Sequence, residues 1–313
     1  MISVEKGVRL APHTYYNIGG LADYFIEAKT NEELCDGVRF SKDQSIPFFI
    51  LGAGSNVLVA DGGYRGLIIR LKTAEVTVSG EHVTASAGVP MALLVQRALA
   101  AGLVGIEWAV GIPGTVGGSI RGNAGCFGGE VKDVLERVEV YDTSSGDRRW
   151  LNAGECDFGY RESIFKKRKE LIVFSGEFRL HSGDTDSART RLKEYAARRS
   201  ASQAIGSKSA GCIFKNISWR RPDVNSDQLL ARFPSFRQFL DLPGIPASYC
   251  IDAANLKGTR VGHVQISPKH GNYFVNLGGA TAEEVIILIG IAKDHVRRKF
   301  GLLLEEEIQY VGF

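Results

Sequence analysis

The sequence lacks the features that mark membrane, secreted or zinc-binding proteins. No apolar run approaches the roughly 18 residues that a membrane-spanning helix needs, and the N-terminus has no apolar core of the signal-peptide type. The cysteines number five, and neither a CxxC pair nor a Cys/His ligand spacing occurs among them. These absences argue against a disulfide framework, membrane insertion and a metal site, and a reducing cytoplasm is the compartment that fits best.

A strong charge of one sign is also missing. The chain carries 38 Lys and Arg against 35 Asp and Glu, a net charge of +3. Such a mild balance suits anionic small molecules and predicts no nucleic-acid partner. With 44% hydrophobic and 23% charged residues in 313, the chain can bury a sizeable core, and its length suits two domains. No internal repeat or low-complexity tract occurs.

Glycine is concentrated in one stretch. Residues 111–129 read GIPGTVGGSIRGNAGCFGG, in which eight of nineteen positions are glycine and only Arg121 is charged. A flexible linker would combine glycine with serine rather than with Ile, Pro, Val and Phe. Because ordered glycine costs backbone entropy, the stretch predicts a backbone that comes very close to something. Two interpretations remain open: a phosphate-rich cofactor, or a tight crossing of two chain segments.

A second glycine-rich loop, LGAGSNVLVADGG at 51–63, follows a predicted strand. Its GxG is half of a dinucleotide-binding fingerprint of the Rossmann type. A Rossmann site needs a helix directly after this loop, but the residues that follow predict a strand and a turn, so a Rossmann site is rejected. Consecutive main-chain N–H groups in such a loop can bind an anion without a helix. Two loops of this kind would suit a dinucleotide, and two independent tight turns are the alternative.

The periodicity predicts alternating strands and helices in a strand-rich first half. A capping box at Thr30 and Glu33 starts one helix, and another at Thr281 and Glu284 starts a long helix ending near Phe300. Residues 217–246, with several prolines, are predicted to be irregular. Further helices are expected at 90–101, from about 190 to 200 and at 247–255. Strands are expected at 47–52, 66–71, 171–180, 261–266 and 273–277. Two hairpins are also expected, one over 76–88 that turns at Gly80 and one formed by 135–142 and 148–151.

Seven motifs then occur in a fixed order. They are IGG at 18–20, LGAGSNVLVADGG, GIPGTVGG with NAG, FGYRESIFK at 158–166, SAGCIFKN at 209–216, LKGTRVGHVQISPKHGNYFVN at 256–276 and LEEEIQYVG at 304–312. In this order the chain resembles the UDP-N-acetylenolpyruvoylglucosamine reductase family of peptidoglycan precursor synthesis. The resemblance runs from about Asn17 to Gly312.

The resemblance implies an α+β flavoenzyme. The fold class it implies is an FAD-binding domain of the vanillyl-alcohol-oxidase (PCMH) type plus a smaller α+β substrate-binding domain. We expect residues 1–185 to form the FAD domain in two subdomains, 186–303 the substrate domain, and 304–313 a C-terminal segment with a catalytic glutamate. Some relatives attach FAD through a His or Cys in the first loop, and GAGSN has neither, so non-covalent binding is expected.

The same resemblance assigns the cofactor contacts to the two glycine loops and one strand. These residues are Gly52, Ala53, Gly54, Ser55, Asn56, Val57, Gly111, Ile112, Pro113, Gly114, Thr115, Gly118, Asn123, Gly125 and Ile172.

The implied reaction has two half-reactions. NADPH reduces FAD, and reduced FAD delivers hydride to the enolpyruvyl group of UDP-N-acetylglucosamine enolpyruvate. The developing charge needs a fixed cation and a proton donor. Arg161 matches the family's arginine, and Glu307 its essential glutamate, with Glu305 and Glu306 as neighbouring alternatives. Cys212 stands where most members carry a serine proton donor.

A thiol has an unperturbed pKa of about 8.5, so it can protonate an enolate at least as readily as a serine hydroxyl. Ser209 is the competing donor, and a small buried core cysteine is the structural alternative for Cys212. Asn216, Lys257 and His270 lie at the family's substrate-contacting positions. The rival interpretations are another FAD-dependent oxidoreductase or oxidase on the same fold, and a non-catalytic flavin-binding module.

Overall fold

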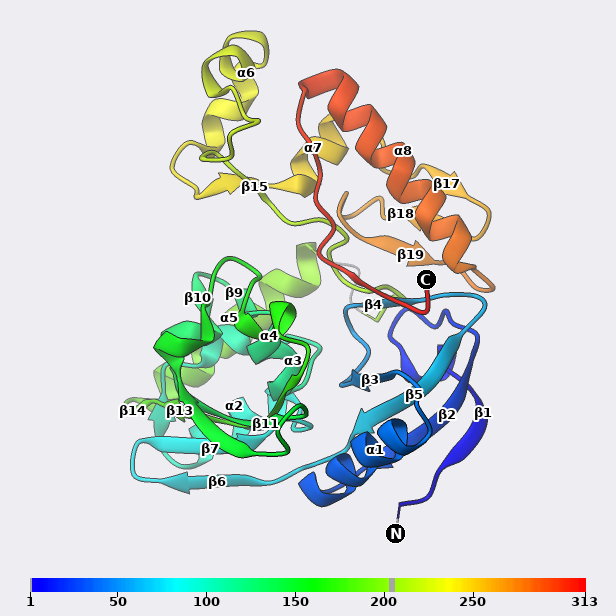
Figure 1. The fold of residues 1–313 in the computed structure, drawn as a ribbon. Coiled ribbons are helices and arrows are strands. Elements are labelled where there is room, and N and C mark those ends of the chain that lie inside the picture. The colour runs from blue at the N-terminus through cyan, green and yellow to red at the C-terminus, as the bar shows by residue number, and fades with distance from the viewer. Residues whose placement is uncertain (1, 203–205) are drawn as a thin grey trace. The chain divides into compact units, whose positions relative to one another are not determined.

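The computed structural model describes residues 2–202 and 206–313, and its chain divides into two compact units (Figure 1). The first unit comprises 1–8, 22–53 and 65–201, and the second comprises 9–21, 54–64 and 202–313. Residues 186–201 thus group with the first unit, whereas 9–21 and 54–64 group with the second. The predicted functional boundaries at 185 and 303 stay a prediction, because compactness alone does not test them.

The first unit contains a four-stranded sheet in the order β1 (Glu5–Arg9), β2 (Leu21–Ala28), β5 (Tyr64–Leu71), β3 (Phe48–Leu51). Helix α1 (Asn31–Asp43) begins at Thr30, whose side chain accepts a hydrogen bond from the Glu33 N–H group, as the capping box predicts. A Cβ at Gly37 would lie 2.3 Å from the Ile26 side chain. Glycine therefore allows α1 to pack closely on this sheet.

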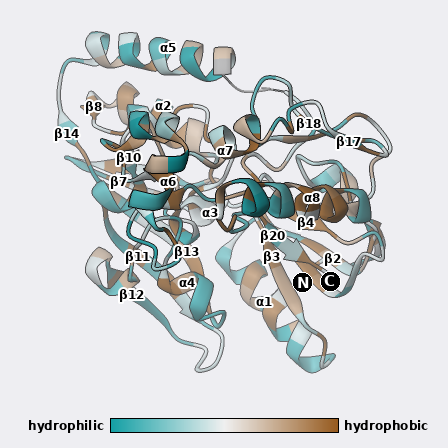
Figure 2. Cartoon of the chain, turned by 90° about the horizontal axis from the view of Figure 1, so that it is seen from above, coloured by the Kyte–Doolittle hydropathy of each residue, from teal (hydrophilic) through white to brown (hydrophobic). Residues whose placement is uncertain are grey.

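A second sheet of the first unit is antiparallel, in the order β12 (Arg148–Asn152), β11 (Leu135–Asp142), β13 (Leu171–Arg179), β7 (His82–Ser86), β6 (Val76–Ser79). Both predicted hairpins are therefore confirmed. One hydrophobic core joins this sheet to helices α2 (Met91–Ala100) and α3 (Val116–Arg121). Helix α5 (Thr185–Ser202) is coloured mostly teal and white in Figure 2, and its residues are largely exposed.

The second unit combines small sheets with helices. Strands β17 (Arg260–Val261), β18 (Val264–Ile266) and β19 (Phe274–Asn276) form an antiparallel sheet, and β4 (Val57–Val59) pairs in parallel with β20 (Gln309–Val311). Helix α8 (Ala282–Phe300) begins at the predicted capping box and ends at Gly301, which adopts a left-handed conformation. The Asp61 carboxylate of the first glycine-rich loop also accepts the N–H groups of Ala282 and Glu283.

The expectation of an irregular segment at 217–246 was wrong in part. The segment contains helix α6 (Ser226–Arg232), the 3₁₀ helix η5 (Pro234–Phe239) and the pair β15 (Ile217–Ser218) with β16 (Gly244–Ile245). The prolines lie outside α6 or at the first position of η5, where a missing N–H group costs nothing. Phe236 is buried against Phe233, Phe300 and Tyr249, so packing stabilises the segment.

The remaining elements complete the described chain. They are η1 (Ala11–His13), β8 (Leu103–Val104), η2 (Glu107–Ala109), β9 (Gly125–Cys126), β10 (Gly129–Glu130), η3 (Val131–Asp133), η4 (Ala153–Cys156), α4 (Ile164–Lys167), β14 (His181–Ser182) and α7 (Ala247–Ala253). No helix of the described residues combines the length and the apolar character needed to cross a bilayer.

Candidate active site

In the first unit, the ends of the two predicted glycine loops lie against each other. Gly52 follows β3, and a Cβ placed on it would lie 2.7 Å from the Thr115 hydroxyl oxygen. Thr115 is the N-cap of α3 and accepts a hydrogen bond from the Gly118 N–H group at 3.4 Å. Any larger residue at position 52 would push the loops apart, so this glycine is required by a close approach.

The glycines of 111–129 serve two different purposes. A Cβ at Gly117 would lie 2.8 Å from the Ala87 Cβ, and one at Gly129 only 2.4 Å from the Trp108 ring, so these two allow chain segments to cross. At Gly118 the nearest atom to a Cβ would be 3.6 Å away, and at Gly128 nothing lies within 4 Å. The crossing interpretation therefore accounts for Gly117 and Gly129. At Gly118 and Gly128, by contrast, no other part of the chain packs closely over the backbone.

Asn123 is fully buried and its side chain is fully engaged within the protein. The Asn123 Nδ2 group donates to Glu130 Oε2 and to the Gly159 carbonyl, both at 2.9 Å, and Oδ1 accepts from the Lys132 N–H group. Its φ of +40° lies in the left-handed region, where asparagine is favoured among non-glycine residues. Asn123 therefore joins the glycine loop to the turn that carries Arg161.

Arg161 lies in that turn with a left-handed backbone, φ +57°. Gly159 and Glu162 exchange N–H···O=C hydrogen bonds of 3.0 and 3.1 Å around it. The Arg161 guanidinium donates to the Gly125 carbonyl at 2.9 Å and lies over the Tyr160 ring. Left-handed non-glycine residues cost free energy and cluster at functional sites. The turn holds a permanent cation at the edge of the glycine loop.

The other predicted residues of the first unit are Ala53, Gly111, Ile112, Pro113, Gly114, Gly125 and Ile172. Gly111 needs its glycine for a φ of +74°, and Ile172 is buried in β13, opposite Tyr141 of β11. Their contacts with a cofactor stay a prediction.

In the second unit, Cys212 and Glu307 are carried by adjacent segments. The Glu307 N–H group donates to the carbonyl of Ile213, the residue after Cys212, at 2.7 Å. The Asn56 side chain donates to the Glu307 carbonyl at 3.2 Å, and the Asn56 carbonyl accepts from Gln309 at 3.0 Å. The first glycine-rich loop, through Gly54, Ser55, Asn56 and Val57, therefore lies beside the glutamate segment.

The neighbouring acids of the LEEE run have other partners. Glu305 forms an ion pair with Lys215 at 2.5 Å, and Glu306 forms one with Lys293 at 2.9 Å. Ser209, the competing proton donor, is buried and its hydroxyl lies 3.5 Å from that of Ser207.

The three predicted substrate residues are also in the second unit. Asn216 Oδ1 accepts from the Ala247 N–H group at 3.3 Å, and Lys257 forms an ion pair with Asp252 at 2.5 Å. Burial, and then the charge of Lys257, hold the pKa of His270 below its usual value. The imidazole of His270 is therefore neutral near pH 7, with Nδ1 accepting from the Asn272 N–H group.

Comparison with known proteins identifies the family. A family model described as the C-terminal domain of UDP-N-acetylenolpyruvoylglucosamine reductase matches residues 203–311, and one described as an FAD binding domain matches 22–152. The chain is 40% identical to the UDP-N-acetylenolpyruvoylglucosamine reductase of Carboxydothermus hydrogenoformans over 97% of its length and 92% of that protein. It is 36% identical to that of Shouchella clausii, over 99% of its length and 91% of that protein.

The crystal structure of the same reductase from Thermus caldophilus superimposes with a TM-score of 0.78 at 33% identity, over 99% of this chain and all of that one. The chain belongs to the UDP-N-acetylenolpyruvoylglucosamine reductase family. The predicted family and the predicted fold class, an FAD-binding domain plus the C-terminal domain of this reductase family, are therefore confirmed.

Sequence reasoning missed three contacts that hold helix α5 within the first unit. Glu107, which is 5% exposed, forms an ion pair with Arg191 at 2.8 Å. The rings of Phe127 and Tyr195 stack at 4.5 Å, and Arg199 Nη1 lies 3.7 Å from Cys126 Sγ. Residues 195 and 199 are one helical turn apart, but nothing in the sequence identifies the loop that they contact.

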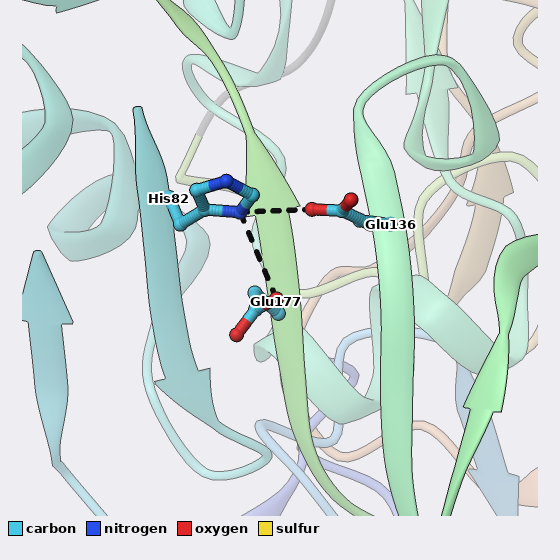
Figure 3. Close-up of side chains that lie close together, drawn as sticks. All are labelled: His82, Glu136 and Glu177. Carbon is cyan, nitrogen blue, oxygen red and sulfur yellow. Dashed lines mark ion pairs between the residues drawn. The ribbon is translucent and has the colours of Figure 1, made fainter. Parts of the chain in front are cut away.

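One group of the described residues has the composition of a metal site. His82, Glu136 and Glu177 converge from β7, β11 and β13, where an irregular register around Glu136 alters the pairing of β11 with β13 (Figure 3). His82 Nδ1 lies 2.8 Å from Glu136 Oε2. Arg137 already donates to both Glu177 oxygens, at 2.8 and 2.9 Å. The group is therefore an ion-pair network with a cation of its own.

Proposed function

We propose that this protein reduces UDP-N-acetylglucosamine enolpyruvate to UDP-N-acetylmuramate with NADPH, through non-covalently bound FAD. One observation supports it above the others. The predicted proton donor and the predicted glutamate are 95 positions apart in the sequence, yet the Glu307 N–H group bonds to the residue beside Cys212. The cytoplasm, where peptidoglycan precursors of this kind are made, is the proposed location.

The residues of the two loops suit FAD. Loop 111–125 contains no acidic side chain, and its uncovered backbone at Gly118 leaves room beside Thr115. Main-chain N–H groups of such a loop can bind a diphosphate. When bound, FAD supplies the hydride chemistry that no side chain of this protein can perform. Gly52, Gly54, Ser55, Asn56 and the residues of loop 111–125 are the proposed contacts.

The proposed roles of the side chains follow from the charge that develops. Hydride addition at C3 of the enolpyruvyl group leaves negative charge on C2 and the carboxylate. Arg161 is always charged and can bind a carboxylate with two parallel hydrogen bonds, so it stabilises that charge. The Cys212 thiol donates its proton to C2. Glu307 orients the substrate beside it, and Asn216, Lys257 and neutral His270 bind the rest of the molecule.

Two measurements on the purified protein test this function. The absorption spectrum should show bound flavin, and NADPH consumption beyond one equivalent per flavin should require the enolpyruvyl substrate, with the product gaining two hydrogen atoms in its mass. A colourless protein that does not take up FAD would contradict the proposal. Flavin reoxidised by O₂ alone would indicate an oxidase, and flavin that NADPH never reduces would indicate a binding module.

A further inference from the structure

A short segment, 212–215, lies between two other segments of the second unit. On one side the Ile213 carbonyl accepts from Glu307, and the Lys215 N–H group donates to the Glu305 carbonyl at 2.8 Å. On the other side the Ile213 N–H group donates to the Asn272 carbonyl at 2.9 Å. Isolated bridges pair Cys212 with Tyr273 and Phe214 with Glu306. The segment is therefore the central strand of a minimal three-stranded arrangement.

At Phe214 a side chain takes the place of a strand neighbour. The Phe214 N–H group donates to Asn272 Oδ1 at 2.9 Å, and Asn272 Nδ2 donates to the Phe214 carbonyl at 2.7 Å. A carboxamide offers the same donor and acceptor as a peptide group, so it can complete a ladder where the backbone does not continue. Asn272 is 2% exposed and Phe214 is 1% exposed, so water cannot replace these bonds.

We propose that Asn272 is a positioning residue for the proton-donating half of the reaction, an inference that rests on the proposed function. Its carboxamide fixes the backbone of Phe214, two residues after Cys212. The same segment receives the Glu307 N–H group through Ile213. Asn272 thus holds the thiol and the glutamate segment in one geometry without contacting substrate. A displacement of about 1 Å at reacting groups can lower a rate by about 100-fold.

Neither leucine nor an ionised aspartate at position 272 could pair both the N–H group and the carbonyl group of Phe214. Leucine at 272 would fill the volume but leave the Phe214 N–H and carbonyl groups unpaired and buried. An ionised aspartate would keep the acceptor for the N–H group but would turn a second acceptor oxygen toward the Phe214 carbonyl. A protonated aspartate restores the donor, because its O–H group can take the position of Nδ2.

The test measures the two half-reactions separately by stopped-flow absorbance of the holoenzyme. We expect Asn272→Leu and Asn272→Asp at neutral pH to reduce flavin with NADPH within about twofold of the wild-type rate. Reoxidation by the enolpyruvyl substrate should be about 100-fold slower, and that loss should be in the rate at saturation rather than in KM. An unchanged reoxidation rate, or an equal loss in both half-reactions, would overturn the proposal.

Asn276 provides a matched control in the same unit. It is 5% exposed, donates to the Tyr16 carbonyl at 3.0 Å and accepts from the Gly278 N–H group at 2.8 Å, so these side-chain hydrogen bonds go to segments other than 212–215. Asn276→Leu should lower the unfolding temperature as Asn272→Leu does and leave the ratio of the two half-reactions unchanged. If both variants change that ratio equally, Asn272 is merely structural.

Two further readouts keep the proposal testable if Asn272→Leu does not fold. The reoxidation rate of Asn272→Asp relative to wild type should recover as pH falls, since burial raises the pKa of a carboxyl group and protonation restores the donor. In addition, the double variant Asn272→Asp/Cys212→Ser should lose less reoxidation rate than the product of the two single losses. The reason is that both substitutions act through the proton donor at position 212. Additive losses, or no recovery at low pH, would overturn the proposal.

A wild-type enzyme that cannot reduce the substrate would instead refute the proposed function.

Discussion

At the scale of single residues, the site depends on unusual backbone positions as much as on reactive groups. Arg161 and Asn123 both have positive φ values and are joined through Gly159. Asn123 was predicted as a cofactor contact, and its buried side chain serves the protein's own loops. The motif identified Asn123 as part of the predicted cofactor loop, and the structure adds that its side chain supports neighbouring segments. Its contact with the cofactor stays a prediction.

The first prediction concerns Cys212. Cys212→Ala should keep NADPH-driven reduction of the flavin and slow reoxidation by the enolpyruvyl substrate by at least about 100-fold, the usual contribution of a positioned proton donor. Cys212→Ser should retain part of the rate, because a hydroxyl also carries a proton. Stopped-flow absorbance separates the two steps. Cys35→Ala, on helix α1, is the control and should behave as wild type. Normal turnover in Cys212→Ala would remove this thiol from the mechanism.

At the scale of elements, helix α5 illustrates how a polar helix is held in place. Burial alone would raise the pKa of Glu107, but hydrogen bonds from Arg191 and from the Gly105 N–H group outweigh it, and the net pKa lies below the usual value. The folded pKa is thus lower than the unfolded one. The stabilisation is present above about pH 4.3, the unfolded value, and is lost as pH falls through the folded pKa.

The second prediction follows from that pair. Arg191→Leu leaves the buried Glu107 carboxylate without its cation, so amide hydrogen exchange across 185–201 should become about tenfold faster at pH 7. The difference from wild type should begin to shrink as pH falls below about 4.3, the unfolded pKa, and should disappear as pH falls through the lower folded pKa of Glu107. Arg189→Leu is a matched control, since Arg189 forms its ion pair with Asp186, an exposed residue of the same helix. Equal effects of the two variants would show that the Glu107 pair does not hold the helix.

At the scale of the whole molecule, the predicted cofactor residues belong to both compact units. Gly52 and Ala53 are in the first unit, whereas Gly54, Ser55 and Asn56 are in the second. A ligand that binds only folded protein stabilises every part that it contacts. The position of the flavin can therefore be tested through stability as well as through activity.

The third prediction is that FAD raises the unfolding midpoint of both units. At a free concentration of about 100 times Kd, the gain should be about 2.7 kcal/mol. Single-tryptophan variants can report on each unit, since Trp108 and Trp150 lie in the first and Trp219 in the second. Urea unfolding of apoprotein and holoprotein would give the two midpoints. Stabilisation of the first unit alone would exclude loop 54–57 from the cofactor site.

Most of the regular elements were predictable from the sequence because their signals are local. The capping boxes of α1 and α8, the hairpin of β6 and β7 and the strand β13 each depend on neighbouring residues. The helix within 217–246 was missed because prolines surround it and its stability comes from distant aromatic contacts. Asn272 was missed for the same reason, since its partner Phe214 is 58 positions away.

By itself, the sequence determined the family, the fold class and the order of the motifs, because these are carried by residue types and their spacing along the chain. Only the tertiary structure decided which glycines allow chain crossings, that Asn123 and Asn272 support neighbouring segments, and that Glu307 lies beside the Cys212 segment. The physical reason is that hydrogen bonds and close packing join residues far apart in the chain, and the pattern along the sequence does not specify those partners.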